Sequence, residues 1–295
     1  LSPGATCGIR KVAWAGWGIG IMAEMRIGGA REAVREAGQG PDVLLLHCSS
    51  SHSGQWAPLI EALAPRHRVR APDFLGYGRS DPLPEDGAPC SRHDAAVVAR
   101  ILADAPGPVH LVGHSLGGTV ALRAALNDPG RVASLTMVEP VLFGLLEEAS
   151  HPARIEPLQL AQDLNVLLVF RPPEDAARAF TDFWGGTGAF DALPGATRDY
   201  LVATIGRVAA DFRALSHLAP GAIALGDLAR VSMPVRLISG GATRPAARAV
   251  IDLLRQALPG AVWTEIAGAG HMAPVTHARA VNAAIVEGLA AAAAR

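Results

Sequence analysis

The sequence is poor in cysteine and in net charge, and each shortage excludes a class of protein. Only three of its 295 residues are cysteines, Cys7, Cys48 and Cys90, and none of them forms a Cys-x-x-Cys pair. We therefore expect no disulfide framework and no metal site, and this cysteine usage fits a reducing cytoplasm. The 26 basic and 27 acidic residues give a formal net charge of −1 without any basic run, which argues against nucleic-acid binding.

The chain is also short of long apolar runs near its beginning. Residues 12–23 are apolar and follow Arg10-Lys11, but the run is broken by glycine and is too short to span a bilayer. It faintly resembles a signal peptide, yet it has no clear small-x-small cleavage site. We predict that residues 1–24 are a disordered leader, that the folded protein begins near Met25, and that it is cytoplasmic and without a membrane span. Export is the alternative.

Apolar runs typical of buried strands alternate with helical segments along most of the chain. Strands are expected at residues 43–47, 68–71, 109–112, 132–138, 235–239 and 261–266, with helices between them. Continuous apolar strands separated by helices predict an α/β fold, in which helices cover both faces of a parallel sheet.

One long segment interrupts this alternation. Residues 141–231 contain no convincing strand and are predicted to be a helical cap, inserted between core segments 25–140 and 232–295. The cap carries an aromatic cluster, and most of its rings are expected to pack inside the cap while one or two face a substrate pocket. The cluster consists of Phe170, Phe180, Phe183, Trp184 and Phe190.

A candidate nucleophile lies where an apolar strand meets a helix, in Gly113-His-Ser115-Leu-Gly117. The pattern Gly-x-Ser-x-Gly between a strand and a helix predicts a tight turn that exposes the serine hydroxyl, with glycines where a Cβ would clash. Serine needs a base to become nucleophilic. The best candidate is His271, on the small-residue loop that follows the last predicted strand and therefore at the same sheet edge as Ser115.

Together these features resemble the α/β-hydrolase superfamily, from about Met25 to the C-terminus. The resemblance is carried in order by His47-Cys-Ser-Ser, the segment from Asp73 to Asp81, the Ser115 elbow and Gly270-His271. It implies a mostly parallel, eight-stranded sheet, Ser115 as nucleophile, His271 as base and hydrolysis without a cofactor.

The acid of the expected triad departs from the family pattern. Members of the superfamily commonly carry an aspartate after the strand at residues 235–239, where this chain has Gly240-Gly-Ala-Thr243. Glu139, at the end of the preceding strand, is predicted to be the acid instead, which keeps the order nucleophile, acid, base along the chain. The alternative is that Glu139 pairs with an arginine of the cap.

The loop after the strand at residues 43–47, which is expected to bind the oxyanion, also departs from the family pattern. Cys48 replaces the usual glycine after His47. Backbone N–H groups stabilise an oxyanion, so donors from Ser49 and Leu116 survive this change. Cys48, His114 and Trp184 are candidate substrate contacts.

The sequence therefore predicts a serine esterase that acts on small or medium apolar esters through an acyl-enzyme. Lactonase, carbon–carbon bond hydrolase and perhydrolase activities would use the same triad and stay open, since the cap pocket decides between them. A non-catalytic protein of this fold that binds a ligand is the alternative from another class. No feature of the sequence indicates an oligomeric state.

Overall fold

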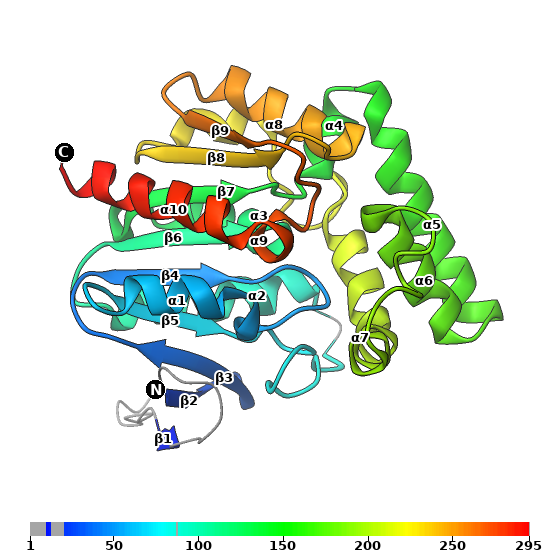
Figure 1. Cartoon of the computed structure of the whole chain (residues 1–295), viewed down its shortest axis with the longest axis horizontal. Helices are drawn as coiled ribbons and strands as arrows, with labels where there is room; N and C mark the ends of the chain where they lie inside the picture. Colours follow the sequence, from blue (N-terminus) through cyan, green and yellow to red (C-terminus); the bar gives the residue numbers. More distant parts are fainter. Residues whose placement is uncertain (1–9, 13–20, 87, 295) are drawn as a thin grey trace.

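A single twisted sheet with helices on both faces forms the body of the protein. The computed structural model describes residues 10–12, 21–86 and 88–294. The sheet order is β1-β2-β3-β5-β4-β6-β7-β8-β9 (Figure 1). The strands are β1 Arg10–Val12, β2 Ile21–Ile27, β3 Ala30–Ala37, β4 Asp42–Leu46, β5 Arg68–Pro72, β6 Val109–His114, β7 Val132–Val138, β8 Val235–Gly240 and β9 Val262–Ile266.

The strand directions match the predicted class. Strands β1, β2 and β3 pair in an antiparallel manner, β3 is antiparallel to β5, and all pairs from β5 to β9 are parallel. Strands β2 to β9 form the expected eight-stranded, mostly parallel sheet, and β1 adds a ninth strand at one edge. The central strands β4 and β6 are buried along their whole length, which explains their continuous apolar sequence.

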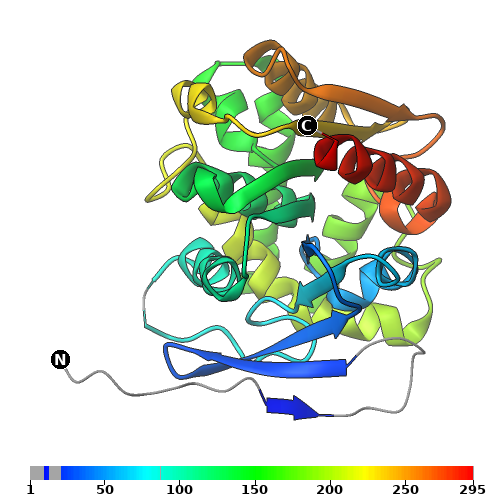
Figure 2. The same cartoon turned by 90° about the vertical axis from the view of Figure 1, so that its left-hand side faces the viewer.

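Helices cover the two faces of the sheet and enclose two separate apolar cores. One face carries α1 Ala57–Leu63, α9 Ala273–Thr276 and α10 Ala278–Ala293, and the other carries α2 Cys90–Asp104, α3 Leu116–Asn127 and α8 Pro245–Ala257 (Figure 2). Short 3-10 helices lie at Ser53–Trp56, Pro129–Arg131, Pro152–Arg154 and Leu225–Arg230.

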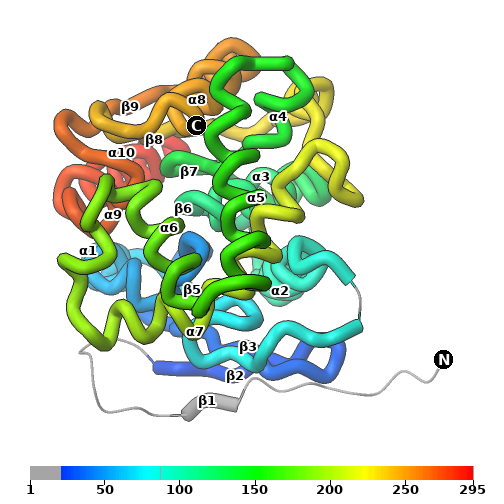
Figure 3. The backbone as a smooth tube through the Cα atoms, turned by 90° about the vertical axis from the view of Figure 1, so that its right-hand side faces the viewer, coloured from blue at the N-terminus to red at the C-terminus, as the bar shows by residue number. Residues whose placement is uncertain are grey.

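The insertion between β7 and β8 is entirely helical in its regular structure. It contains α4 Phe143–Glu148, α5 Ile155–Phe170, α6 Pro173–Gly185 and α7 Gly195–Ala214. Helices α5, α6 and α7 lie beyond the carboxyl ends of the parallel strands, and Figure 3 shows them in front of that sheet edge. Phe180 and Phe190 are buried, but Phe170 is 77% exposed and does not belong to the core of this cap.

The expected leader needs a correction. Strand β2 begins at Ile21, four residues before the expected domain start, and pairs along its length with β3. Residues 10–12 form β1 on the outer side of β2. Backbone pairing therefore places these residues in the sheet, although they lie within the segment expected to be disordered. The rest of the leader, residues 1–9 and 13–20, lies outside the described residues. Within the described part of the chain, no helix has both the length and the hydropathy needed to cross a membrane.

Candidate active site

Ser115 lies on a strained turn between β6 and α3. Its backbone has φ 55° and ψ −118°, a conformation that is costly for a residue with a side chain. The glycines on either side make the turn possible. A Cβ on Gly113 would lie 2.2 Å from the carbonyl oxygen of Gly117, and a Cβ on Gly117 would lie 2.2 Å from that of Leu46. The elbow is therefore packed directly against the end of β4.

The three side chains expected to form a triad meet at the carboxyl edge of the sheet. His271 Nε2 lies 2.9 Å from Ser115 Oγ, and His271 Nδ1 lies 2.8 Å from Glu139 Oε2. Both are hydrogen-bond distances, and all three residues are at most 5% exposed. With its proton on Nδ1, the imidazole donates to Glu139 while Nε2 accepts from the serine hydroxyl.

Glu139 lies directly after β7, and its backbone has φ 42°. Both oxygens of its carboxylate accept hydrogen bonds. Oε1 accepts a 2.7 Å hydrogen bond from the Gly240 N–H, and Oε2 accepts from Thr243 as well as from His271. Burial alone would raise the pKa of this carboxyl, but the hydrogen bonds from His271, Thr243 and Gly240 lower it below its usual value. Glu139 is therefore ionised at neutral pH. Among the described residues, the Glu139 carboxylate contacts His271 and not an arginine of the cap.

Thr243 has a role that sequence reasoning missed. It occupies the position where an aspartate was expected, and its Oγ1 donates a 2.7 Å hydrogen bond to Glu139 Oε2. The loop after β8 therefore still contributes to the acid, as a donor to the carboxylate of the neighbouring strand. The N–H of Gly240, the last residue of β8, completes this arrangement.

The two expected oxyanion donors lie on segments that pack together, the elbow and the chain that follows β4. Leu116 is the first residue of α3, so its N–H has no partner within the helix. Ser49 follows β4, against whose end the elbow packs. Among the described residues, neither N–H donates to a protein acceptor. Both groups are consequently available to a ligand oxygen.

Cys48 and His114, two of the candidate substrate contacts, are buried and have protein partners. Burial raises the pKa of the Cys48 thiol to about 12, so the thiol stays protonated, and the Cys48 N–H donates to Gln55 Oε1. His114 is fully buried, bonds the carbonyl of His271 at 2.9 Å through Nε2, and contacts Gln55 through Nδ1. Burial lowers the pKa of His114 to about 3, which keeps it neutral. The bond from His114 supports the loop that carries His271.

Trp184 of α6 contacts the candidate base directly. Its ring lies parallel to the imidazole of His271, with centroids 3.5 Å apart and planes inclined by 15°. The cap thus covers one face of His271, and Trp184 is itself half-buried. The sequence marked this residue as an aromatic of the cap and as a candidate substrate contact, but not as a partner of His271.

One cluster of possible metal ligands is paired with an arginine. Cys90, Asp94 and Asp211 lie close enough to share an ion. Arg207 reaches both Asp94 oxygens at 2.8 and 2.9 Å and also pairs with Asp211, so its guanidinium supplies the positive charge there. Burial opposes this charge, but the two carboxylates raise the pKa of Arg207 well above its usual value. The cluster is an ionic network, and it does not fit a metal.

Comparison with known proteins gives the family. The model of the alpha/beta hydrolase family matches residues 43–284. The chain therefore belongs to this family, and its strand order and cap agree with that assignment.

Individual relatives and solved structures are similar in different ways. A pimeloyl-[acyl-carrier protein] methyl ester esterase of Methylococcus capsulatus is 38% identical over 105 residues, which is 36% of this chain and 39% of that esterase. The match thus spans less than two-fifths of that relative. A hydrolase from Pseudomonas aeruginosa has a TM-score of 0.74 at 23% identity, covering 91% of this chain and 98% of the other. The enol-lactonase from Burkholderia xenovorans has a TM-score of 0.73 at 20% identity, covering 90% and 99%. These two likenesses show the fold.

Proposed function

We propose that the protein is a serine hydrolase that cleaves carboxylic esters of small to medium apolar substrates through an acyl-enzyme on Ser115. The observation that carries this proposal is the continuous hydrogen-bonded series from Ser115 Oγ through His271 to Glu139. Nucleophile, base and orienting acid are then in the geometry that acyl transfer needs. A curated relative named as a methyl ester esterase supports the same reaction class.

In this mechanism the Ser115 oxygen attacks the ester carbonyl while His271 Nε2 takes the hydroxyl proton. The imidazolium is stabilised by the ionised Glu139, and the N–H groups of Ser49 and Leu116 hold the oxyanion. His271 then gives the proton to the leaving alkoxide, and the acyl group remains on Ser115. In the second half, His271 deprotonates a water molecule that attacks the acyl-enzyme, which releases the carboxylic acid and restores the serine.

A serine nucleophile also limits the reactions that this fold can catalyse. Dehalogenase and epoxide-hydrolase reactions of this fold need a carboxylate nucleophile, so they are disfavoured. Lactones are cyclic esters and would follow the same steps. The non-catalytic alternative rested on the missing aspartate at position 243, and the hydrogen bond from Thr243 to Glu139 weakens that argument.

The proposal is tested with a fluorophosphonate probe and a panel of p-nitrophenyl esters of increasing acyl length. We expect the wild type to bind one probe covalently and to hydrolyse the shorter esters, and Ser115→Ala to do neither. Ser134→Ala is the matched control, because Ser134 Oγ also lies 2.7 Å from a histidine nitrogen, that of His110, but away from the elbow. Equal ester turnover in wild type and Ser115→Ala, or a wild type that the probe does not label, would overturn the proposal.

A further inference from the structure

Helix α7 of the cap carries a buried polar stripe that faces the core domain. Tyr200, Thr204, Arg207 and Asp211 are spaced by four, three and four residues, so they lie on one side of the helix. Thr204, Arg207 and Asp211 are 6%, 7% and 0% exposed. Buried polar side chains are costly without partners, so the partners of this stripe indicate its purpose.

Three members of the stripe bind three consecutive residues of the segment after β4. Ser49 Oγ donates to Asp211 Oδ2 at 2.7 Å. The hydroxyls of Ser50 and Thr204 lie 2.5 Å apart, and the Tyr200 hydroxyl donates to the Ser51 carbonyl at 2.8 Å. Each of the three residues in the segment that carries the candidate oxyanion donor is thus hydrogen-bonded to helix α7 of the cap.

This segment needs external support, because its backbone is strained. Ser50 has φ 53°, in the left-handed region that residues with a Cβ disfavour. Such a conformation is unfavourable and persists only where surrounding contacts impose it. The hydrogen bonds to α7 supply those contacts on Ser49, Ser50 and Ser51, directly after the Cys48–Ser49 peptide that carries the Ser49 N–H.

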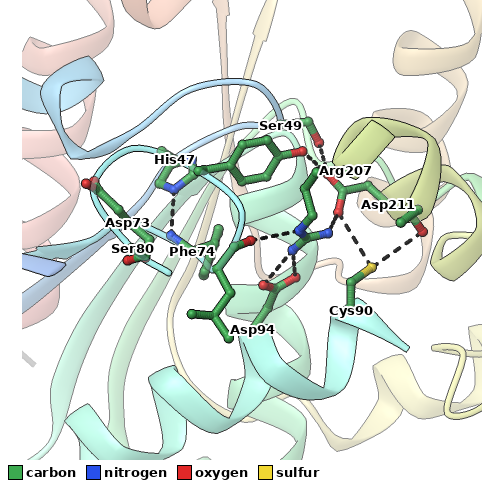
Figure 4. A network of polar contacts seen from close by, with 12 residues as sticks. His47, Ser49, Asp73, Phe74, Ser80, Cys90, Asp94, Arg207 and Asp211 are labelled. Atoms are coloured by element: carbon green, nitrogen blue, oxygen red, sulfur yellow. Dashed lines mark hydrogen bonds and ion pairs between the residues drawn. The ribbon is translucent and has the colours of Figure 1, made fainter. Parts of the chain in front are cut away.

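The far end of the stripe anchors α7 to the core domain. Asp211 accepts a 2.5 Å hydrogen bond from the Tyr77 hydroxyl and pairs with Arg207. Arg207 in turn binds Asp94 of α2 and donates from Nε to the Leu75 carbonyl at 2.9 Å (Figure 4). Ser49 therefore bonds to a carboxylate whose position is fixed from several sides.

We propose that Tyr200, Thr204 and Asp211 are positioning residues for oxyanion binding, so that the oxyanion site is complete only while α7 of the cap is docked. This inference rests on the proposed hydrolase function. The cap then does more than shape a pocket: it holds the Ser49 N–H where the oxyanion forms. An interaction that acts on the transition state should change kcat more than KM.

The test removes one hydroxyl of the stripe at a time. Thr204→Val deletes the partner of Ser50 while keeping the side-chain shape, and Thr204→Ser keeps the hydroxyl. Thr181→Val in α6 is the matched control, since Thr181 and Thr204 both bond the carbonyl four residues earlier but only Thr204 also contacts the segment after β4. Ester hydrolysis and the rate of fluorophosphonate labelling are both measured.

We expect Thr204→Val to lower kcat by about 5- to 10-fold, the size of one lost hydrogen bond, with KM changed less than about twofold. The labelling rate should fall by a similar factor, Thr204→Ser should restore both, and Thr181→Val should match the wild type. Ser50→Ala should reproduce the loss from the other side, and adding Thr204→Val to it should cost little more. The pair of variants keeps the test valid if one of them folds poorly.

Other results would overturn the inference in distinguishable ways. If the wild type is labelled and active but Thr204→Val and Ser50→Ala keep its kcat, the positioning role is wrong while the hydrolase function stands. A rise in KM with kcat unchanged would assign the stripe to substrate binding instead. A wild type that is neither labelled nor active would remove the proposed function and this inference together.

Discussion

Trp184 stacks on His271 with their ring centroids 3.5 Å apart and their planes inclined by 15°. The indole comes from the cap and the imidazole from the loop after β9, so two parts of the chain meet at the candidate base. The backbone carbonyl of His271 also bonds to His114 Nε2 at 2.9 Å. The orientation of the imidazole is therefore defined by the cap as well as by Glu139.

Removing the indole should loosen the base. We expect Trp184→Ala to lower kcat by about 3- to 10-fold, because an aromatic contact of this kind contributes about 0.5–1.5 kcal/mol. Trp184→Phe keeps an aromatic face and should lose less. Steady-state kinetics on p-nitrophenyl butyrate measure both, with Trp263→Phe as the control. Full activity in Trp184→Ala would show that the stack does not orient His271.

Glu139 and Thr243 should contribute very unequally to kcat. Glu139→Gln removes the negative charge beside His271 Nδ1 and should lower kcat by about 10³- to 10⁴-fold, the effect of losing a triad acid. Thr243→Val removes one hydrogen bond to the carboxylate and should cost only about 5-fold. Ester turnover and probe labelling report both values. If Glu139→Gln retains wild-type turnover, the acid is not Glu139.

The acid should be movable to the neighbouring loop. Thr243 Oγ1 lies 2.7 Å from the Glu139 oxygen that contacts His271, so a carboxylate at position 243 would stand beside the same nitrogen. We expect Glu139→Ala with Thr243→Asp to be at least about tenfold more active than Glu139→Ala alone, because a charged partner of the base is restored. Kinetics on the single and the double variant check this, and equal activity of the two would contradict it.

The elbow glycines should be intolerant of a single methyl group. Gly113→Ala would place a Cβ 2.2 Å from the Gly117 carbonyl oxygen, in a buried turn that has no room to move. We expect a loss of about 3 kcal/mol or more in unfolding free energy, or failure to fold. Gly130→Ala is the control, since nothing lies within 4 Å of the added Cβ. Urea denaturation compares the two, and equal midpoints would refute the packing argument.

Glu32 should make the stability depend on pH. Burial and the nearby charge of Asp94 raise the pKa of Glu32 from 4.5 to about 8. Between these values the folded protein keeps the proton and the unfolded chain loses it, so rising pH favours unfolding by about 1.4 kcal/mol per pH unit.

Glu32→Gln, which cannot ionise, should therefore gain stability relative to the wild type as the pH rises from 5 to 8, and the gain should vanish below about pH 4.5. Urea denaturation at each pH measures the difference. Glu61→Gln, which removes an exposed carboxyl of α1, is the control. A difference that does not change with pH would show that Glu32 is not held protonated.

Much of the fold and the centre of the candidate site follow from short stretches of sequence. The Ser115 elbow depends on five consecutive residues. The continuous apolar composition of the strands predicts that they are buried in a parallel sheet. Once the strands are in order, His271 and Glu139 come to the same sheet edge, because the carboxyl ends of parallel strands meet there. Because position 243 holds threonine where the family commonly has aspartate, the sequence predicted that Glu139 is the acid.

The partners that act across the chain could not be predicted in this way. Whether Thr243 donates to Glu139 depends on how the loop after β8 folds beside the end of β7. Whether Trp184 covers His271 and whether α7 holds Ser49 depend on how the cap docks on the sheet. These contacts join residues that are about 90 to 160 positions apart in the chain. The chemistry of a side chain limits the kinds of group that it can bind. The packing of elements that are distant in the sequence decides which of these groups it contacts. The sequence by itself determined the chemistry available at the elbow, and the tertiary structure decided how the cap shares in it.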